Sequence, residues 1–229
     1  MHDSWELIEL GNYSAAIVQS EYEFLTAPSG LSLTNAAIAH LLAGELDLAR
    51  HVCERKVNFD DGESCHTFLL MGVIDWLSGS HPRAIDRWVR AESASYTDAA
   101  GGFGPLGFQM FAAVALGDER MKDLIFTKLR KLITNAKGSN GWPIPAAKLL
   151  IGDMTEAAVL EVVEHSAAHS ILKDRWRCQA YFYFAVMAAN EGKQNHAKEC
   201  FNESVSQPSR AILLECEYYL AALWAGWNR

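Results

Sequence analysis

Apolar side chains recur at helical spacing along most of the chain, and no run of β-branched residues alternates strictly with polar ones. Several apolar runs lead up to a glycine, for example Leu41–Leu42 before Gly44 and Val186–Ala189 before Gly192. Ala-rich stretches such as 36–43 also favour helix over strand. The pattern therefore predicts an all-α protein with almost no sheet.

A six-residue pattern, Gly-x-x-x-x-Ala, follows these apolar runs. It occurs at Gly11–Ala16, Gly44–Ala49, Gly79–Ala84 and Gly192–Ala197, more loosely at Gly152–Ala157, and in degenerate form at Gly117. The six glycines are 33 to 40 residues apart, a period typical of stacked helical hairpins. Glycine accepts the left-handed conformation that ends the first helix of a hairpin, and the small alanine lets the second helix cross the first closely.

The expected elements are six helical hairpins and a final helix. The hairpins fall near 4–10 and 13–25, 32–43 and 45–57, 64–78 and 81–93, 105–116 and 118–135, 144–151 and 154–167, and 174–191 and 193–205. The helix at 210–227 would cap the open end of the stack. Two inserts rich in Gly and Pro, 95–105 and 137–145, are predicted loops. The whole chain, 1–229, reads as one domain, an α-α superhelical solenoid.

Large and small residues stand at fixed offsets in two of these hairpins. They are Phe68, Met71, Gly72, Trp88 and Ala91 in one, and Tyr181, Phe184, Ala185, Phe201 and Ser204 in the other, with Pro208 after the last copy. This arrangement resembles the tetratricopeptide repeat. The resemblance implies a scaffold that binds other proteins, because such arrays present broad surfaces.

Charge is distributed unevenly along the chain, whose net charge is −8. Residues 1–49 hold seven acidic side chains and no Lys or Arg, and a further acidic loop carries Asp60, Asp61 and Glu63. Residues 118–137 have a net charge of +3, but they read as an ordinary amphipathic helix, and an acidic chain argues against nucleic acid. The acidic end is either a solvated face or a field that attracts a basic protein.

Ten residues are candidates for contact with a protein partner. The acidic ones are Glu6, Glu9, Glu21 and Glu23, expected to be exposed, together with Asp60, Asp61 and Glu63. The repeat register places His66, Trp76 and Phe182 on inner faces, where they would supply buried anchors. Trp76 fits a plain core position as well.

Motifs for catalysis are weak. Residues 102–107 match the dinucleotide fingerprint Gly-x-Gly-x-x-Gly, but no strand precedes them. His165 and His169 are four apart on a predicted helix, without an evident third metal ligand. The five cysteines form no Cys-x-x-Cys pair and read as small buried hydrophobes. We therefore expect no enzyme activity, cofactor or metal.

The N-terminus lacks the basic and apolar segments of a signal peptide, and no run of eighteen apolar residues occurs. Scattered, unpaired cysteines fit a reducing compartment. Together these features predict a cytoplasmic protein that does not enter a membrane.

A second resemblance involves the turn Gly141–Pro145, a short helix ending at Gly152, and the run Cys178–Tyr183. It is similar to a divergent class of bacterial tetratricopeptide-like proteins, some of which are encoded beside polymorphic (Rhs-type) toxins and serve as their immunity proteins. The resemblance covers roughly residues 95–225 and implies binding and neutralisation of a cognate toxin domain.

The alternative is a general adaptor or peptide-binding chaperone, and the mostly apolar inner positions lack the Lys, Arg and Asn clamp common in such arrays. An enzyme with an unrecognised site is a third possibility.

Overall fold

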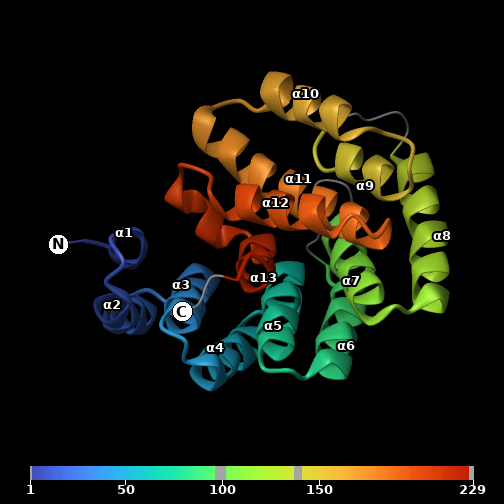
Figure 1. The fold of residues 1–229 in the computed structure, drawn as a ribbon. Helices are drawn as coiled ribbons and strands as arrows, with labels where there is room; N and C mark the ends of the chain where they lie inside the picture. The colour runs from blue at the N-terminus through green and yellow to red at the C-terminus, as the bar shows by residue number, and fades with distance from the viewer. Residues whose placement is uncertain (1, 96–101, 137–140, 227–229) are drawn as a thin grey trace. The chain divides into compact units, whose positions relative to one another are not determined.

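A computed structural model describes residues 2–95, 102–136 and 141–226. Every regular element in these residues is helical, which confirms the all-α prediction (Figure 1). The helices are α1 Ser4–Glu9, α2 Tyr13–Thr26, α3 Gly30–Leu42, α4 Leu46–Phe59, α5 Cys65–Leu77, α6 His81–Ala91, α7 Phe103–Leu116, α8 Glu119–Asn135, α9 Ile144–Leu150, α10 Glu156–Ser166, α11 Ser170–Asn190, α12 Gln194–Val205, the 3-10 helix η1 Arg210–Leu214 and α13 Cys216–Trp224.

Contacts between Cα atoms divide the chain into two compact units, residues 1–96 and residues 97–228. Unit 1 holds α1 to α6, and unit 2 holds α7 to α13. A single domain over 1–229 stays a prediction. Residues 96–101 and 137–140 of the two predicted loops lie outside the described residues, while residues 103–105 and 144–145, predicted as loop, belong to α7 and α9.

The predicted hairpin turns share one geometry. All six glycines have positive φ, between 67° and 81°. In each turn the residue after the glycine donates its N–H to the carbonyl five residues earlier, at 2.8–2.9 Å, as Glu45 does to His40 and Lys193 to Ala188. This bond closes a helix around a left-handed residue. The following alanine is buried at positions 16, 49, 84 and 197, whereas Ala157, in the looser copy, is exposed.

Replacing a turn glycine should destabilise the protein through backbone strain alone. A Cβ atom at Gly44 or Gly192 would meet nothing within 4 Å, but φ is +79° and +75°. We expect Gly44→Val and Gly192→Val each to lower the free energy of unfolding by about 1–2 kcal/mol. Gly44→Asn should cost less, because asparagine tolerates this region. Urea unfolding followed by circular dichroism measures the difference, and equal stability of Gly44→Val and wild type would contradict the assigned turn.

Unit 1 packs its helices in chain order, each hairpin against the next. In the α5–α6 hairpin the Trp88 indole lies across the α5 backbone. Its Nε1 atom donates to the Leu69 carbonyl at 3.2 Å. A Cβ atom at Gly72 would stand 2.1 Å from that Nε1 atom. Gly72 therefore provides the space that lets the fully buried Trp88 side chain fill the hairpin.

A buried carboxylate joins three helices of unit 1. Asp75 on α5 is fully buried. Arg50 on α4 donates from Nε at 2.9 Å, and Arg83 and Arg87 on α6 approach it at 2.8 and 3.6 Å. Because the desolvated carboxylate is surrounded by three guanidinium groups, its removal would leave positive charges without their counter-charge.

Unit 2 is organised around α11. This helix contacts α7, α9, α10, α12 and α13, so hairpins that are not consecutive in the chain touch each other. A one-dimensional repeat array joins each hairpin only to its neighbours. Because α9 has only seven residues, it does not separate α7 from α11, and these two helices are in contact. Unit 2 therefore departs from a simple solenoid.

The fingerprint-like segment 102–107 forms the start of α7. Gly102 is the N-cap of α7, and Gly107 lies inside that helix, so no strand precedes the motif among the described residues. A Cβ atom at Gly107 would lie 2.6 Å from the Tyr183 hydroxyl. Phe103 also packs edge-on against Tyr183, with ring centroids 5.0 Å apart. The motif allows α7 and α11 to cross closely.

The predicted final helix at 210–227 is interrupted. Residues Arg210–Leu214 form η1, and Glu215 is extended, with φ −86° and ψ 124°, before α13 begins. Glu215 is buried and accepts hydrogen bonds from Arg175 and Gln179 on α11. Burial raises the pKa of the Glu215 carboxyl, and Arg175 opposes that shift. These long-range bonds override the continuous apolar pattern of the segment.

Candidate protein-binding surface

The first hairpin places acidic side chains at the start of unit 1. Asp3 caps α1, and its carboxylate accepts the Glu6 N–H at 2.8 Å while Glu6 accepts the Asp3 N–H at 3.1 Å. This reciprocal capping box is the one that the spacing of Asp3 and Glu6 indicates. The carboxylates of α1 are thus held in fixed positions on a short, capped helix.

Glu6 and Glu9 are exposed, as the sequence predicts. The Glu9 carboxylate accepts the Trp5 indole N–H at 2.9 Å, and Glu6 lies 3.1 Å from His2 Nδ1. Within the described residues, neither carboxylate forms an ion pair with Lys or Arg. Their negative charge is therefore directed at solvent and is available to an incoming cationic side chain.

Glu23 is not an exposed steering residue, which corrects one prediction. Its carboxylate accepts the Ser4 N–H at 2.9 Å, the Ser4 hydroxyl at 2.6 Å and the Gln19 amide at 3.1 Å. The Asn35 amide in turn donates to the Ser4 hydroxyl at 2.9 Å. Glu23 thereby ties α2 to the start of α1 and, through Ser4, to α3.

Glu21 is likewise half-buried rather than free at the surface. Both of its oxygens accept from the Arg55 guanidinium, at 2.6 and 3.0 Å, so α2 is joined to α4. These hydrogen bonds lower the pKa of the Glu21 carboxyl. Arg55 also lies over the Phe24 ring, which packs edge-on against Phe59. A substitution at Glu21 would change this contact as well as the surface charge.

The acidic loop after α4 also contains both paired and solvent-facing carboxylates. Asp60 forms an ion pair with Lys56 at 2.5 Å and belongs to the internal structure of the hairpin. Asp61 and Glu63 are exposed, and Asp61 has a positive φ of 51°. Two of the three predicted carboxylates in this loop therefore face solvent.

The predicted aromatic anchors belong to the core. Trp76 is 4% exposed and stacks on His81 and Trp88, with ring centroids 4.1 and 5.8 Å away. Phe182, in unit 2, is fully buried among the rings of other aromatic residues. Neither can touch a partner in this structure, because neighbouring side chains cover both. His66 is half-buried on α5.

Sequence reasoning missed an exposed apolar stripe on α2. Val18, Tyr22 and Leu25 are 71%, 57% and 78% exposed. Their spacing of four and three residues places them on one face of the helix, opposite the buried Ala16 and Ser20. The signal was present in the sequence, because the apolar residues of 13–26 lie on two faces of the helix, and one hairpin covers only one of them.

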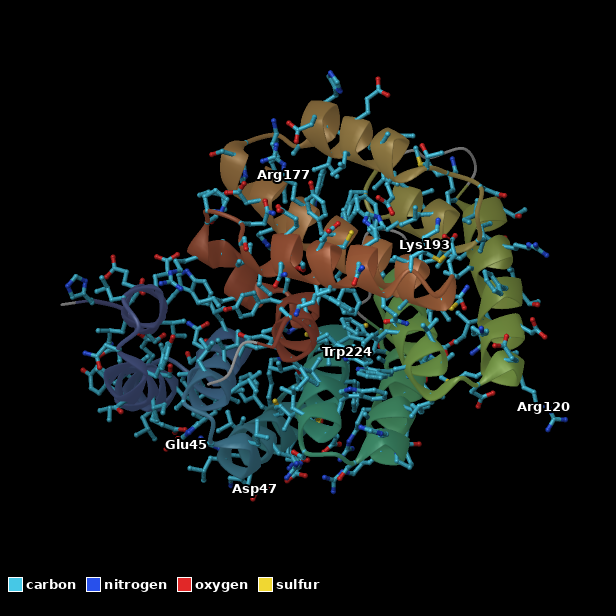
Figure 2. The ribbon with its side chains drawn as sticks, in the orientation of Figure 1. Glu45, Asp47, Arg120, Arg177, Lys193 and Trp224 are labelled. Atoms are coloured by element: carbon cyan, nitrogen blue, oxygen red, sulfur yellow. The ribbon has the colours of Figure 1, made fainter. Side chains whose placement is uncertain are left out.

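Unit 1 also accounts for the net charge of the protein. Residues 1–96 hold 14 acidic and 6 basic side chains, and the remainder holds 14 of each. Arg50, Arg55 and Lys56 are engaged in ion pairs with carboxylates of the same unit. The acidic residues Glu45 and Asp47 lie at the α3–α4 turn (Figure 2). The exposed apolar stripe of α2 therefore lies in the unit that carries the excess of negative charge.

Unit 2 contains a shallow apolar pocket of about 160 Å³. Trp224 on α13 forms one wall (Figure 2), and Phe111 on α7 and Phe201 on α12 form others. Gln194 is the only polar residue among those lining it. The pocket is smaller than the usual ligand cavity of about 300–1,000 Å³, and its lining supplies no titratable group for acid–base chemistry.

The two histidines noted in the sequence, His165 and His169, have separate hydrogen-bond partners. His165 Nδ1 bonds the Glu161 carbonyl at 2.8 Å. His169 instead caps α11, accepting the Leu172 N–H at 3.1 Å. Each ring thus has a separate structural partner at a different helix end.

Comparison of the chain with protein-family models and with curated protein sequences gave no match. None of the helices among residues 2–95, 102–136 and 141–226 has the length and apolar character needed to cross a membrane.

Proposed function

We propose that the protein is a non-catalytic, tetratricopeptide-like scaffold of the cytoplasm that binds a cognate bacterial toxin domain and neutralises it. The observation that carries the proposal is the α2 stripe of Val18, Tyr22 and Leu25 in the acidic unit. Tyrosine is enriched among the residues that dominate binding energy. The exposed carboxylates of α1 steer a basic partner, and the stripe supplies the apolar centre of the interface.

The partner is a protein with a basic surface. Exposed apolar side chains at helical spacing suit a complementary protein surface better than a small molecule, which needs a concave site. The alternative, a peptide-binding chaperone that clamps a terminal carboxylate, needs available basic side chains. The arginines Arg50, Arg83 and Arg87 are instead gathered on Asp75, and this engagement favours the toxin-binding proposal.

Reversing the charge of α1 should slow association with the toxin domain encoded by the adjacent gene. We expect Glu6→Lys combined with Glu9→Lys to reduce the association rate about tenfold at low ionic strength, because steering raises association rates by about 10- to 1,000-fold. High salt should bring the wild-type rate close to the mutant rate. Glu21 and Glu23 stay unchanged, since both hold the fold together. Stopped-flow fluorescence measures the rate.

The matched control is Asp123→Lys combined with Glu161→Lys, which makes the same change of net charge on exposed positions of unit 2. It should leave the association rate nearly unchanged. Equal slowing by both pairs would show that net charge alone matters, and an unchanged rate for the α1 pair would contradict the proposed surface.

Co-expression of the toxin domain tests neutralisation: wild type should restore growth. Failure of wild type to do so, or an adjacent gene encoding no toxin domain, would contradict the immunity role.

A further inference from the structure

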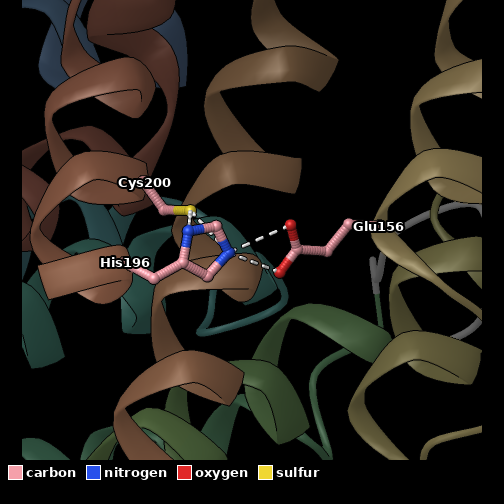
Figure 3. Close-up of side chains that lie close together, drawn as sticks. All are labelled: Glu156, His196 and Cys200. Atoms are coloured by element: carbon pink, nitrogen blue, oxygen red, sulfur yellow. Dashed lines mark hydrogen bonds and ion pairs between the residues drawn. The ribbon is translucent and has the colours of Figure 1, made fainter. Parts of the chain in front are cut away.

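Three metal-ligating side chains meet in unit 2, on two helices. Glu156 is the first residue of α10, and His196 and Cys200 lie one turn apart on α12 (Figure 3). One donor atom from each lies within 4.8 Å of the others. Glu156 and His196 are half-buried, whereas Cys200 is 3% exposed. The cluster therefore has a protected side at the sulfur and an open side toward solvent.

The separations from His196 to the other two donors match a tetrahedral metal ion, and the third separation, from Glu156 to Cys200, is at most 4.8 Å. His196 Nε2 is 3.0 and 3.2 Å from the two Glu156 oxygens and 3.7 Å from Cys200 Sγ. Zinc bonds of about 2.0–2.1 Å to nitrogen and oxygen and about 2.3 Å to sulfur give tetrahedral edges of about 3.3 Å (N to O) and 3.5 Å (N to S). Each observed separation is within about 0.3 Å of these values.

A carboxylate stands behind the histidine. When Nε2 faces the metal, Nδ1 carries the proton, and Nδ1 lies 3.8 Å from a Glu199 oxygen. Metal-bound histidines commonly donate their second N–H to a carboxylate, which fixes the ring and strengthens the ligand. Glu199 is the exposed neighbour of Cys200 on α12, and at 3.8 Å it stands near His196 Nδ1 without a hydrogen bond to it.

We propose that Glu156, His196 and Cys200 bind a divalent transition-metal ion, Zn²⁺ by the chemistry of the donors, with the fourth position open to solvent. Nitrogen, thiolate and carboxylate together are the donor set that zinc prefers. On binding, the metal–sulfur bond replaces the S–H bond, and the thiol proton passes to solvent. The ion would join α10 to α12 and stabilise unit 2.

The surroundings of Cys200 are apolar and acidic. Burial raises the pKa of the Cys200 thiol to about 12, with Glu156, Glu199 and Glu203 adding to the shift. The three carboxylates that disfavour a thiolate attract a divalent cation.

The test uses the metal-free full-length chain titrated with Co²⁺, whose spectrum reports thiolate and tetrahedral ligation. We expect a thiolate-to-cobalt charge-transfer band and intense visible bands that saturate at one equivalent and are displaced by Zn²⁺. Cys200→Ser should abolish the charge-transfer band. His196→Gln and Glu156→Gln should each weaken binding at least about tenfold, and Glu199→Gln about 10- to 100-fold, the range for outer partners.

The matched control is Cys178→Ser, which alters another buried cysteine of unit 2 whose sulfur lies 3.6 Å from the Ser204 hydroxyl. It should keep the full Co²⁺ spectrum. Zn²⁺ should raise the melting temperature of wild type and Cys178→Ser but not of Cys200→Ser. If Cys200→Ser does not fold, the loss of Co²⁺ affinity in His196→Gln, at a half-exposed position, tests the site instead. No charge-transfer band in wild type, its survival in Cys200→Ser, or an unchanged Co²⁺ affinity in His196→Gln would overturn the proposal.

Discussion

Asp75→Ala should lower the free energy of unfolding by about 3–5 kcal/mol, the cost of removing one partner from a buried ion pair. The substitution leaves three guanidinium groups around an uncharged site, and two of them, those of Arg50 and Arg87, are largely buried. Because Arg50 comes from α4 and the others from α6, the loss affects three helices of unit 1. Urea denaturation followed by far-ultraviolet circular dichroism measures the change.

The control is Asp86→Ala, which removes an exposed carboxylate from α6. Surface substitutions usually change stability by less than about 0.5 kcal/mol, so the two aspartates should differ by several kcal/mol. Similar effects at Asp75 and Asp86 would show that the buried cluster does not hold the three helices together.

Gly72→Ala should destabilise the protein by about 3 kcal/mol, at the upper end of the range for overpacked cores. The added Cβ would stand 2.1, 2.5 and 2.7 Å from three atoms of the Trp88 indole. The indole is rigid, fully buried and hydrogen-bonded to Leu69, so it cannot move without losing contacts. Thermal unfolding of the full-length protein measures the effect.

Gly30→Ala is the matched control, since it makes the same chemical change in another helix. Its Cβ would meet only the flexible end of Lys56, at 3.3 Å. Alanine favours the helix over glycine by about 0.5–1 kcal/mol, so Gly30→Ala should be neutral or stabilising. Destabilisation by Gly30→Ala equal to that by Gly72→Ala would attribute both effects to something other than the contact with Trp88.

The sequence predicted the hairpins well because the turn signal is local. A glycine, the apolar run before it and the alanine after it all lie within a few turns of helix, as at Gly44 and Gly192. The role of α11 was not predictable in this way. It depends on which helices touch across long sequence separations, and nothing local to Gly107 indicates that Tyr183 will pack on it.

The binding surface was predicted only in part for the same reason. Charge patterning identified the acidic segment, and Glu6 and Glu9 are exposed as expected. Whether a carboxylate remains free depends on distant partners, and Glu21 lost its exposure to Arg55, 34 residues away. At the proposed metal site, the four-residue spacing of His196 and Cys200 is visible in the local sequence. Nothing near Glu156, 40 residues earlier, indicates that it will join them.

The central claim is that α1 and α2 form the surface that binds a basic toxin domain. Hydrogen–deuterium exchange of the full-length protein, alone and bound to the product of the adjacent gene, tests it most directly. Binding should slow exchange in residues 4–26, and Tyr22→Ala, which truncates the centre of the exposed stripe, should weaken both the complex and this protection. A stable complex whose protection is confined to unit 2, with residues 4–26 exchanging as in the free protein, would contradict the account.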